Sequence, residues 1–235
     1  MTTHDVPTAQ TLAVHSVEGF LTAAECAAVR AEMREVLLAH GEQTFGAARS
    51  TSVHSVDGLP TETAMKLYEP AGRVEVTPVP DAVRRIAEGA FARAAGTFGR
   101  AVPAASRIAD LIYIEYGEGQ FVTPHVDYRH NDDDPRRPKV AGISILLSDD
   151  HVGGEFFVET CGSDESWVDT DGVPTVREGA DSSGEWFTSL RRTRWRAQPR
   201  AGDAVVYGSQ LTHGTEPVVA GRACKLIGFL TTGGD

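Results

Sequence analysis

The chain has 235 residues, with 22 Lys and Arg against 33 Asp and Glu, and a formal net charge of −11. This length, with 41% hydrophobic residues, predicts one domain with its own core and excludes a disordered or collagen-like chain. The negative charge argues against a nucleic-acid or membrane-surface protein, because both partners are anionic. The one dense basic run, Arg191–Arg196 with Arg200 beyond it, is too short to change that expectation.

The cysteines and the first residues bear on the cellular compartment. Cys26, Cys161 and Cys224 are scattered and form no C-x-x-C pair, so we expect reduced thiols in a cytoplasmic protein. The polar start of the chain lacks a secretory pattern, and no apolar run approaches the ~18 residues of a membrane span. We therefore expect a chain that is neither exported nor anchored.

Two amphipathic helices are predicted in the first half of the chain. The first spans residues 19–38, where Thr22 and Glu25 have the spacing of a capping box and apolar residues then recur on one face. The second follows Pro80 and ends near Gly96–Gly99. We expect both apolar faces to pack against the core.

From residue 108 onward the hydrophobic period changes to two, which is typical of strands. The predicted strands are Ile108–Tyr116, Val140–Leu147, Glu155–Val158, Ala204–Tyr207 and Leu226–Thr231. Helices followed by strands, without βαβ alternation, predict a single α+β domain over residues 1–235, a two-sheet sandwich or jelly roll backed by N-terminal helices. Residues 159–198 form a long insert rich in Gly, Ser, Asp and Glu, which we interpret as a lid; an ornamental surface loop is the alternative.

Three His-x-acid pairs could place two metal ligands on one face of a strand, since residues i and i+2 point the same way. They are His40 with Glu42, His125 with Asp127, and His130 with Asp132. The first lies at the expected end of a helix and the last in a charge-rich loop. Only the pair at 125 and 127 follows a predicted strand, so we take it as the candidate.

His213 is the best-placed third ligand, because it follows the strand predicted at 204–207. Two imidazoles and one carboxylate leave about three open positions, which suits non-haem Fe(II) better than closed tetrahedral zinc. Three unrelated polar residues on surface loops are the alternative. Further along, Arg222 could bind the distal carboxylate of an organic acid whose other end chelates the metal. A buried Arg paired with an acidic neighbour is the other interpretation.

The order of these motifs resembles the Fe(II)/2-oxoglutarate-dependent dioxygenases, in their prolyl-hydroxylase-like branch. The resemblance covers residues 19–230, and each matching segment is weak alone but specific in combination. The segments are Gly19–Leu21, Tyr116–Phe121, Pro124–Asp127, Ile143–Ser148, Gly153–Phe156, Pro199 with Ala201–Asp203, His213 with Glu216–Val218, and Gly221–Arg222.

The resemblance implies a double-stranded β-helix that uses Fe(II), 2-oxoglutarate and O2. His125, Asp127 and His213 take the positions of the family's iron ligands, which form the catalytic centre. Related halogenases have Gly or Ala at the position of Asp127, so the carboxylate indicates hydroxylation, desaturation or cyclisation.

The resemblance also assigns the residues that bind 2-oxoglutarate. Arg222 takes the position of the basic residue that binds the C5 carboxylate, and Lys225 is the fallback because the family's spacing varies. Tyr116 matches a tyrosine that often hydrogen-bonds the same carboxylate, and Ser144 could add a hydroxyl there.

The substrate is less defined by the sequence. Tyr128 and Arg129, directly after Asp127, are the first candidates for substrate binding, and exposed loops supply the others. These are Arg49, His54 and Lys66 in the 43–70 segment, and Trp167, Trp186 and Trp195 in the insert. We expect a small-molecule substrate such as an amino acid or a biosynthetic intermediate. A peptidyl-prolyl hydroxylase, a redox-inactive cupin-like isomerase or lyase, and a binding module are the alternatives.

Overall fold

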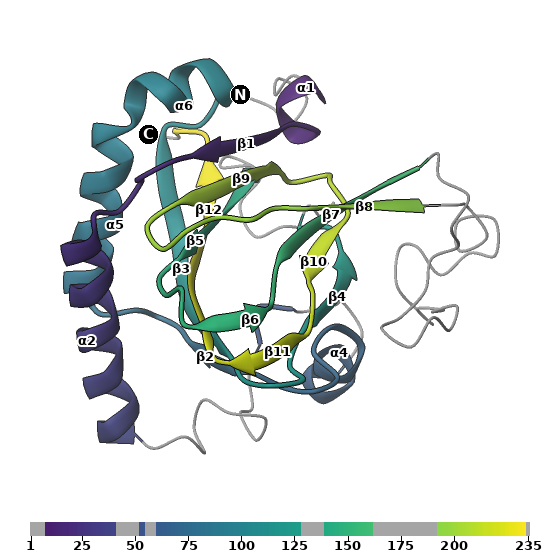
Figure 1. The fold of residues 1–235 in the computed structure, drawn as a ribbon. Coiled ribbons are helices and arrows are strands. Elements are labelled where there is room, and N and C mark those ends of the chain that lie inside the picture. Colours follow the sequence, from purple (N-terminus) through teal and green to yellow (C-terminus); the bar gives the residue numbers. More distant parts are fainter. Residues whose placement is uncertain (1–7, 41–51, 55–59, 128–138, 162–191, 234–235) are drawn as a thin grey trace.

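A computed structural model describes residues 8–40, 52–54, 60–127, 139–161 and 192–233 (Figure 1). The helices are α1 (Thr8–Thr11), α2 (Ala23–His40), α4 (Thr61–Tyr68), α5 (Asp81–Arg93) and α6 (Ala95–Ala101). The strands are β1 (Val14–Val17), β2 (Val74–Val76), β3 (Arg107–Tyr116), β4 (Val122–His125), β5 (Lys139–Leu146), β6 (His151–Gly153), β7 (Phe156–Cys161), β8 (Arg192–Arg196), β9 (Ala204–Gly208), β10 (His213–Thr215), β11 (Val218–Gly221) and β12 (Ala223–Thr231).

The first predicted helix is α2, and its N-terminus is capped as its sequence indicates. The Glu25 backbone N–H donates to Thr22 Oγ1 over 3.2 Å, and the Thr22 backbone N–H donates to Glu25 Oε2 over 2.9 Å. This reciprocal pair satisfies two backbone donors that a helix start leaves open. Cys26, Val29 and Met33 are the buried residues of α2, so the predicted apolar face does pack inward.

The second predicted helix is divided in two. α5 ends at Arg93, and α6 begins at Ala95 after a change of direction at Ala94. The buried residues of α5 pack with those of α2 in one core cluster against the sheet. Figure 1 shows α2 and α5 side by side along one face of the largest sheet. They leave the opposite face of that sheet for the functional site.

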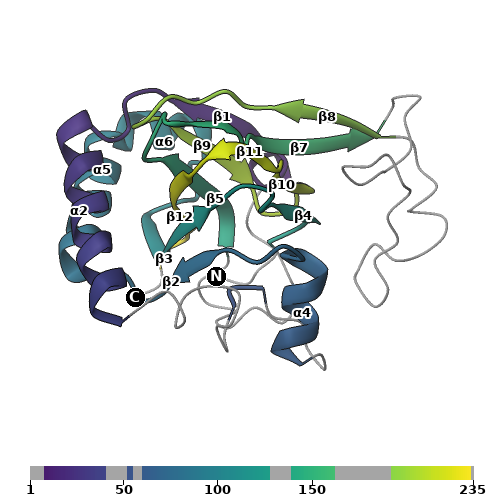
Figure 2. The ribbon, with the colours of Figure 1, turned by 60° about the horizontal axis from the view of Figure 1, so that its bottom comes forward.

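The strands form two sheets that face each other, as the turned view in Figure 2 also shows. The larger sheet has the order β1-β9-β5-β12-β3-β2, and the smaller has the order β4-β10-β7-β8. A third, two-stranded sheet pairs β11 with β6. The predicted α+β jelly roll, a double-stranded β-helix backed by helices, is confirmed.

Alternation along β12 separates the helix-facing side of the large sheet from its inner side. Leu226 and Leu230 belong to the core cluster that includes the helices. Ala223, Ile227 and Phe229 belong to, or pack on, a second cluster between the sheets. Because successive strand residues point to opposite faces, a residue at position 225 faces inward with this second group.

The predicted insert at 159–198 is wrong at its two ends, which are strand. β7 and β8 pair antiparallel from Phe157 opposite Arg196 to Cys161 opposite Arg192. Residues 162–191, and with them the predicted lid, lie outside the described residues. None of the described helices is long and apolar enough to cross a membrane. The cytoplasmic location stays a prediction.

The basic run on β8 is paired with carboxylates of neighbouring segments. Arg194 Nε lies 2.8 Å from Glu159 Oε1, and Arg194 Nη1 lies 3.1 Å from Glu216 Oε2. Arg196 Nε lies 2.8 Å from the other oxygen of Glu216. Arg194 and Arg196 are therefore paired with carboxylates within the fold.

Candidate active site

Three candidate metal ligands converge between the two sheets. His125 ends β4, Asp127 follows two residues later, and His213 begins β10. The two strands pair antiparallel with His125 opposite His213, which makes the imidazoles cross-strand neighbours. One ligand atom of each of the three residues lies within 4.8 Å of the others. Over the described ranges, no other cluster of His, Cys, Asp and Glu meets this condition.

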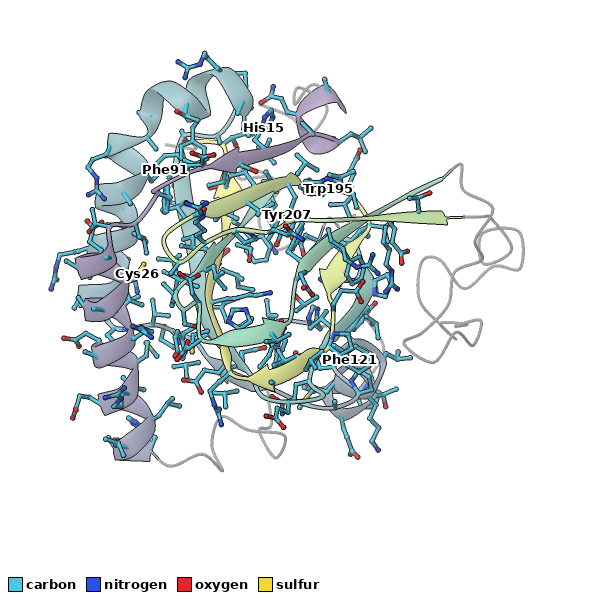
Figure 3. All side chains as sticks on the ribbon, viewed as in Figure 1. His15, Cys26, Phe91, Phe121, Trp195 and Tyr207 are labelled. Atoms are coloured by element: carbon cyan, nitrogen blue, oxygen red, sulfur yellow. The ribbon has the colours of Figure 1, made fainter. Side chains whose placement is uncertain are left out.

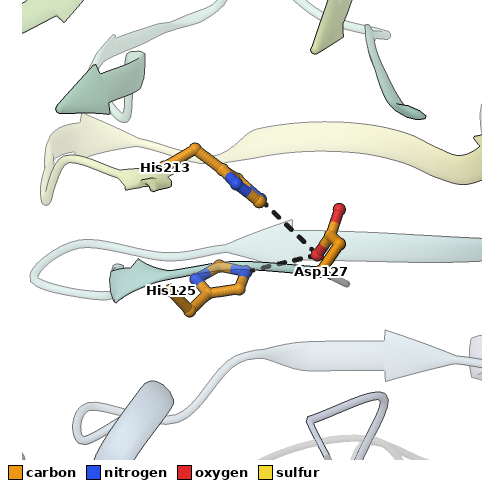
Figure 4. A group of neighbouring side chains, drawn as sticks. All are labelled: His125, Asp127 and His213. Atoms are coloured by element: carbon orange, nitrogen blue, oxygen red, sulfur yellow. Dashed lines mark ion pairs between the residues drawn. The ribbon is translucent and has the colours of Figure 1, made fainter. Parts of the chain in front are cut away.

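Both imidazoles present the same nitrogen to the centre of the group. His125 Nδ1 donates to the Thr123 carbonyl over 2.8 Å, and His213 Nδ1 donates to the Leu211 carbonyl over 2.9 Å. Since a carbonyl only accepts, the proton lies on Nδ1 and the lone pair on Nε2. The Nε2 atoms of His125 and His213 lie 3.7 and 3.6 Å from Asp127 Oδ1 (Figure 4).

This donor set fits Fe(II). Two neutral imidazoles and one carboxylate on one side of an ion leave positions for chelating and oxidising ligands. The backbone carbonyls behind the two imidazoles orient them in the way that metal-binding histidines require. The side chains of His125, Asp127 and His213 are 10, 10 and 4% exposed, so a bound metal would lie in a largely water-excluded place.

The triad lies on the wall of a cavity of about 750 Å³. The inner face of the large sheet forms the opposite wall, where Tyr116, Ser144 and Lys225 line the same cavity. In the register of the large sheet, Lys225 pairs with Ile114, and Ser144 pairs with Ile227. The fold therefore brings a buried cation and two hydroxyl groups from three strands of one sheet to the cavity that holds the triad.

Lys225 is a buried basic residue of this cavity. Its Nζ donates to the Gly154 carbonyl over 2.7 Å and to Thr215 Oγ1 over 3.4 Å, and it lies 5.3 Å from the centroid of the Tyr116 ring. Burial lowers the pKa of Lys225 to about 7; the charge of Glu155 opposes this effect and that of Arg73 adds to it. A carboxylate ligand would supply the counter-charge that the buried ammonium group favours.

Sequence comparison decides which family this site belongs to. Residues 111–229, slightly more than half of the chain, match the 2OG-Fe(II) oxygenase superfamily. The chain belongs to this superfamily. It is therefore an oxidoreductase that uses Fe(II), 2-oxoglutarate and O2. Membership in this superfamily supports the oxygenase and argues against the alternative of a cupin-like isomerase or lyase. No curated protein matches the whole sequence significantly.

Solved structures share the fold of this oxygenase at low identity. A prolyl-4-hydroxylase from Pseudomonas putida superposes with a TM-score of 0.53 and 15% identity, over 94% of this chain and 93% of the other. The carbocyclase SnoK of nogalamycin biosynthesis gives a TM-score of 0.57 and 15% identity, over 99% and 86%. The epimerase SnoN of the same biosynthesis gives 0.54 and 17%, over 94% and 78%.

Arg222 does not lie where the sequence places it. Its side chain is 49% exposed, and Nη1 lies 2.7 Å from Glu115 Oε2, outside the cavity. The reason is strand parity: Arg222 precedes β12 and has the parity of the helix-facing residues, whereas Lys225 shares its face with Ile227. Arg222 and Lys225 are the two basic residues considered as partners of the cosubstrate carboxylate. Of these, Lys225 lines the cavity that holds the triad.

The predicted substrate residues are only partly placed. Tyr128 and Arg129 lie outside the described residues, as do Arg49, Trp167 and Trp186. Lys66 is exposed and pairs with Glu62 over 2.7 Å, and Trp195 is 47% exposed on β8. His54 does line the cavity, where its ring lies edge-on to His125 with centroids 4.6 Å apart.

Two residues of the cavity wall are missed by the sequence analysis. Arg73 is 2% exposed and donates to the Tyr116 hydroxyl over 2.9 Å. Tyr207 is 4% exposed on β9, and its ring centroid lies 4.2 Å from that of His213. An aromatic residue in an apolar strand is more often core than site, so the sequence carries no signal that separates Tyr207 from its neighbours.

Proposed function

We propose that this oxygenase hydroxylates a small molecule, with desaturation and cyclisation as the related outcomes. In this proposal His125, Asp127 and His213 are the iron ligands, and Lys225 binds the C5 carboxylate of 2-oxoglutarate. The observation that supports it most is the shared cavity, in which a His-Asp-His group on one sheet faces a buried lysine on the other. Iron and cosubstrate together supply the oxidising chemistry.

The chain's own residues supply position, charge and exclusion of water. The carbonyls of Thr123 and Leu211 keep Nε2 of each imidazole available as a ligand. The Lys225 ammonium group gives a dicarboxylate one fixed anchor, and Ser144 and Tyr116 line the wall beside it. Such anchoring sets which end of the cosubstrate can reach the metal.

The size and lining of the cavity support a small-molecule substrate. A volume of about 750 Å³ is in the range of small-ligand sites, and 2-oxoglutarate would fill only part of it. The remaining wall includes apolar Ile112, Ile227 and Phe229, with His54 near the triad. The structural neighbours SnoK and SnoN are small-molecule enzymes, but others are prolyl hydroxylases, so a prolyl peptide is the second candidate.

A substrate screen scored by two products tests the proposal. Iron-loaded protein with 2-oxoglutarate and O2 is given small organic acids, amino acids and prolyl peptides, and succinate and oxidised product are both measured. We expect a small molecule to stimulate succinate release with about one product per succinate. If only prolyl peptides stimulated succinate release, the substrate would be a peptide and not a small molecule. Equal turnover by Asp127→Ala would refute the ligand assignment.

A further inference from the structure

Arg73 and Tyr116 form a buried pair at the end of the cavity that holds Lys225. Arg73 directly precedes β2, and its Nη1 donates to the Tyr116 hydroxyl over 2.9 Å. In the antiparallel register of β2 and β3, Val74 lies opposite Glu115, which places Arg73 beside Tyr116. Side chains from both sheets fill the interior (Figure 3), where Arg73 and Tyr116 line the cavity and are 2 and 3% exposed.

The guanidinium group of Arg73 is held by two carboxylates as well as by Tyr116. Its Nη2 lies 2.6 Å from Glu75 Oε2, and its Nε lies 3.3 Å from Glu69 Oε2. Both carboxylate side chains are buried. Because the guanidinium group is planar and rigid, contacts at Nε and Nη2 also fix the position of Nη1, which donates to Tyr116.

This contact determines where the proton of the Tyr116 hydroxyl can point. A guanidinium group only donates, so the hydroxyl oxygen accepts from Arg73 and leaves its own proton for another acceptor. Within the described part of the chain, no side chain or backbone group accepts this proton. Lys225 Nζ lies 5.3 Å from the centroid of the Tyr116 ring, and an ammonium group also supplies donors only. A carboxylate in the cavity could accept from both groups.

We propose that Arg73 is a positioning residue for the cosubstrate, which holds the Tyr116 hydroxyl so that its proton points to the distal carboxylate of 2-oxoglutarate beside Lys225. The proposal rests on the proposed function, in which Lys225 binds that carboxylate. Arg73 acts through Tyr116 and not by contact with the cosubstrate. Loss of the Arg73 contact should therefore weaken the binding of a dicarboxylate that reaches Tyr116, but not the binding of the metal-chelating end.

Two 2-oxo acids separate the distal carboxylate from the chelating end. 2-Oxoglutarate and 2-oxovalerate have the same chain length and the same chelating group, but 2-oxovalerate ends in a methyl group. The Kd of each is measured by anaerobic calorimetric titration of Fe(II)-loaded protein. The proteins are wild type, Tyr116→Phe, Arg73→Lys, the double variant of these two, Tyr113→Phe and Lys225→Met. Thermal unfolding shows whether each one is folded.

Two of these variants serve as matched changes. Arg73→Lys keeps a positive charge for the two buried carboxylates but lacks the planar fork that holds Tyr116. Tyr113→Phe removes another buried tyrosine hydroxyl of β3, which donates to Glu115 over 2.6 Å and lies away from the cavity. A loss of affinity that is specific to Tyr116 and Arg73 is therefore distinguishable from a general effect of the substitutions.

We expect Tyr116→Phe to raise the Kd for 2-oxoglutarate by about 10- to 150-fold, the range of a hydrogen bond to a charged group. Arg73→Lys should raise it by a similar factor. Added to Tyr116→Phe, it should cause less than about a twofold further increase, because the hydroxyl through which it acts is already absent. The Kd for 2-oxovalerate should stay within about twofold of wild type in all of these, and Tyr113→Phe should change neither Kd.

Three results would overturn the positioning role of Arg73. The first is a Kd for 2-oxoglutarate in Tyr116→Phe within about twofold of wild type, which decides the matter even if Arg73→Lys does not fold. The second is a loss in Arg73→Lys that multiplies with that of Tyr116→Phe, because Arg73 would then act independently of the hydroxyl. The third is an equal loss for both 2-oxo acids, which would indicate a role in the fold alone.

Lys225→Met tests the proposed function separately. If this variant binds 2-oxoglutarate as wild type does, Lys225 does not hold the distal carboxylate and the cosubstrate assignment itself fails. If it binds 2-oxoglutarate weakly while Tyr116→Phe and Arg73→Lys bind it as wild type does, the assignment stands and only the role of Arg73 is wrong. Neither result depends on the identity of the substrate.

Discussion

A buried ammonium group such as that of Lys225 makes cosubstrate binding sensitive to pH. Its pKa of about 7 means that the free protein holds it roughly half protonated at neutral pH. A bound carboxylate favours the charged form, so the pKa is higher in the complex than in the free protein. Binding above about pH 7 must therefore take up a proton.

We expect the affinity for 2-oxoglutarate to fall as the pH rises above about 7, by up to about tenfold per pH unit. Calorimetric titration of metal-loaded protein in buffers of different ionisation enthalpy would measure both the Kd and the proton uptake. Lys225→Arg is the control, because a guanidinium group stays charged over this range. An equal slope in Lys225→Arg would assign the pH dependence to another group.

At the scale of elements, a buried ionic cluster places the 52–54 segment beside the triad. Arg73 Nη2 lies 2.6 Å from Glu75 Oε2, and Arg73 Nε lies 3.3 Å from Glu69 Oε2. Glu75 accepts a hydrogen bond from the Val53 backbone over 2.8 Å, and Glu69 accepts one from the Ser52 hydroxyl. His54 follows directly, which explains how a segment without regular structure presents an imidazole to the cavity.

Arg73→Met should destabilise the protein by about 3–5 kcal/mol, because it leaves two buried carboxylates without their cation. For a chain of this length that corresponds to a Tm lowered by about 6–20 °C. Lys66→Met is the matched control, since its ion pair with Glu62 is exposed to solvent and should contribute little to stability. Equal Tm values for the two variants would show that the cluster does not stabilise the fold.

Long strands could be predicted from the sequence, whereas the shortest strands could not. The strands β3, β5 and β12 have enough residues for period-two alternation to be visible. The bounds predicted for β3 and β5 are within one residue of the observed ones, whereas β12 begins at Ala223, before the predicted start at Leu226. The short strands β2, β4 and β10 were missed, because three or four residues carry no period and their positions depend on pairing with distant segments.

In the candidate site, too, some residues could be predicted from the nearby sequence, whereas others depend on how distant strands pair. The convergence of His125, Asp127 and His213 was predicted because motif and strand context agreed. The choice between Arg222 and Lys225 depends on where β12 begins, and boundaries are the least reliable part of a sequence-based assignment. The apolar alternation of Cys224 and Leu226 around Lys225 is the signal that could have found the inward-facing residue.

In the molecule as a whole, the two sheets carry complementary halves of the site. The triad lies on and beside the strands of the small sheet, and Lys225, Ser144 and Tyr116 lie on the large one. A cosubstrate that chelates the metal and also contacts Lys225 would connect the sheets. Metal and 2-oxoglutarate should therefore stabilise the fold together more than either does alone.

Thermal unfolding with and without each ligand measures this coupling. At 100 times its Kd, 2-oxoglutarate should stabilise the metal-loaded protein by about 2.7 kcal/mol, which is about 5–10 °C in Tm. The same concentration should have a much smaller effect after chelation of the metal or in His213→Ala. An equal shift in metal-free protein would place the 2-oxoglutarate site away from the triad.

The most direct test of the account is an anaerobic titration of Fe(II)-loaded protein with 2-oxoglutarate, followed by the visible charge-transfer band expected of this cofactor chemistry. We predict the band for wild type and Arg222→Ala at the same concentration, and none for His125→Ala or His213→Ala. Lys225→Met should require about 10- to 150-fold more 2-oxoglutarate, because a charge-assisted contact contributes about 1.5–3 kcal/mol. A full band in His213→Ala, or a loss in Arg222→Ala with none in Lys225→Met, would contradict the account.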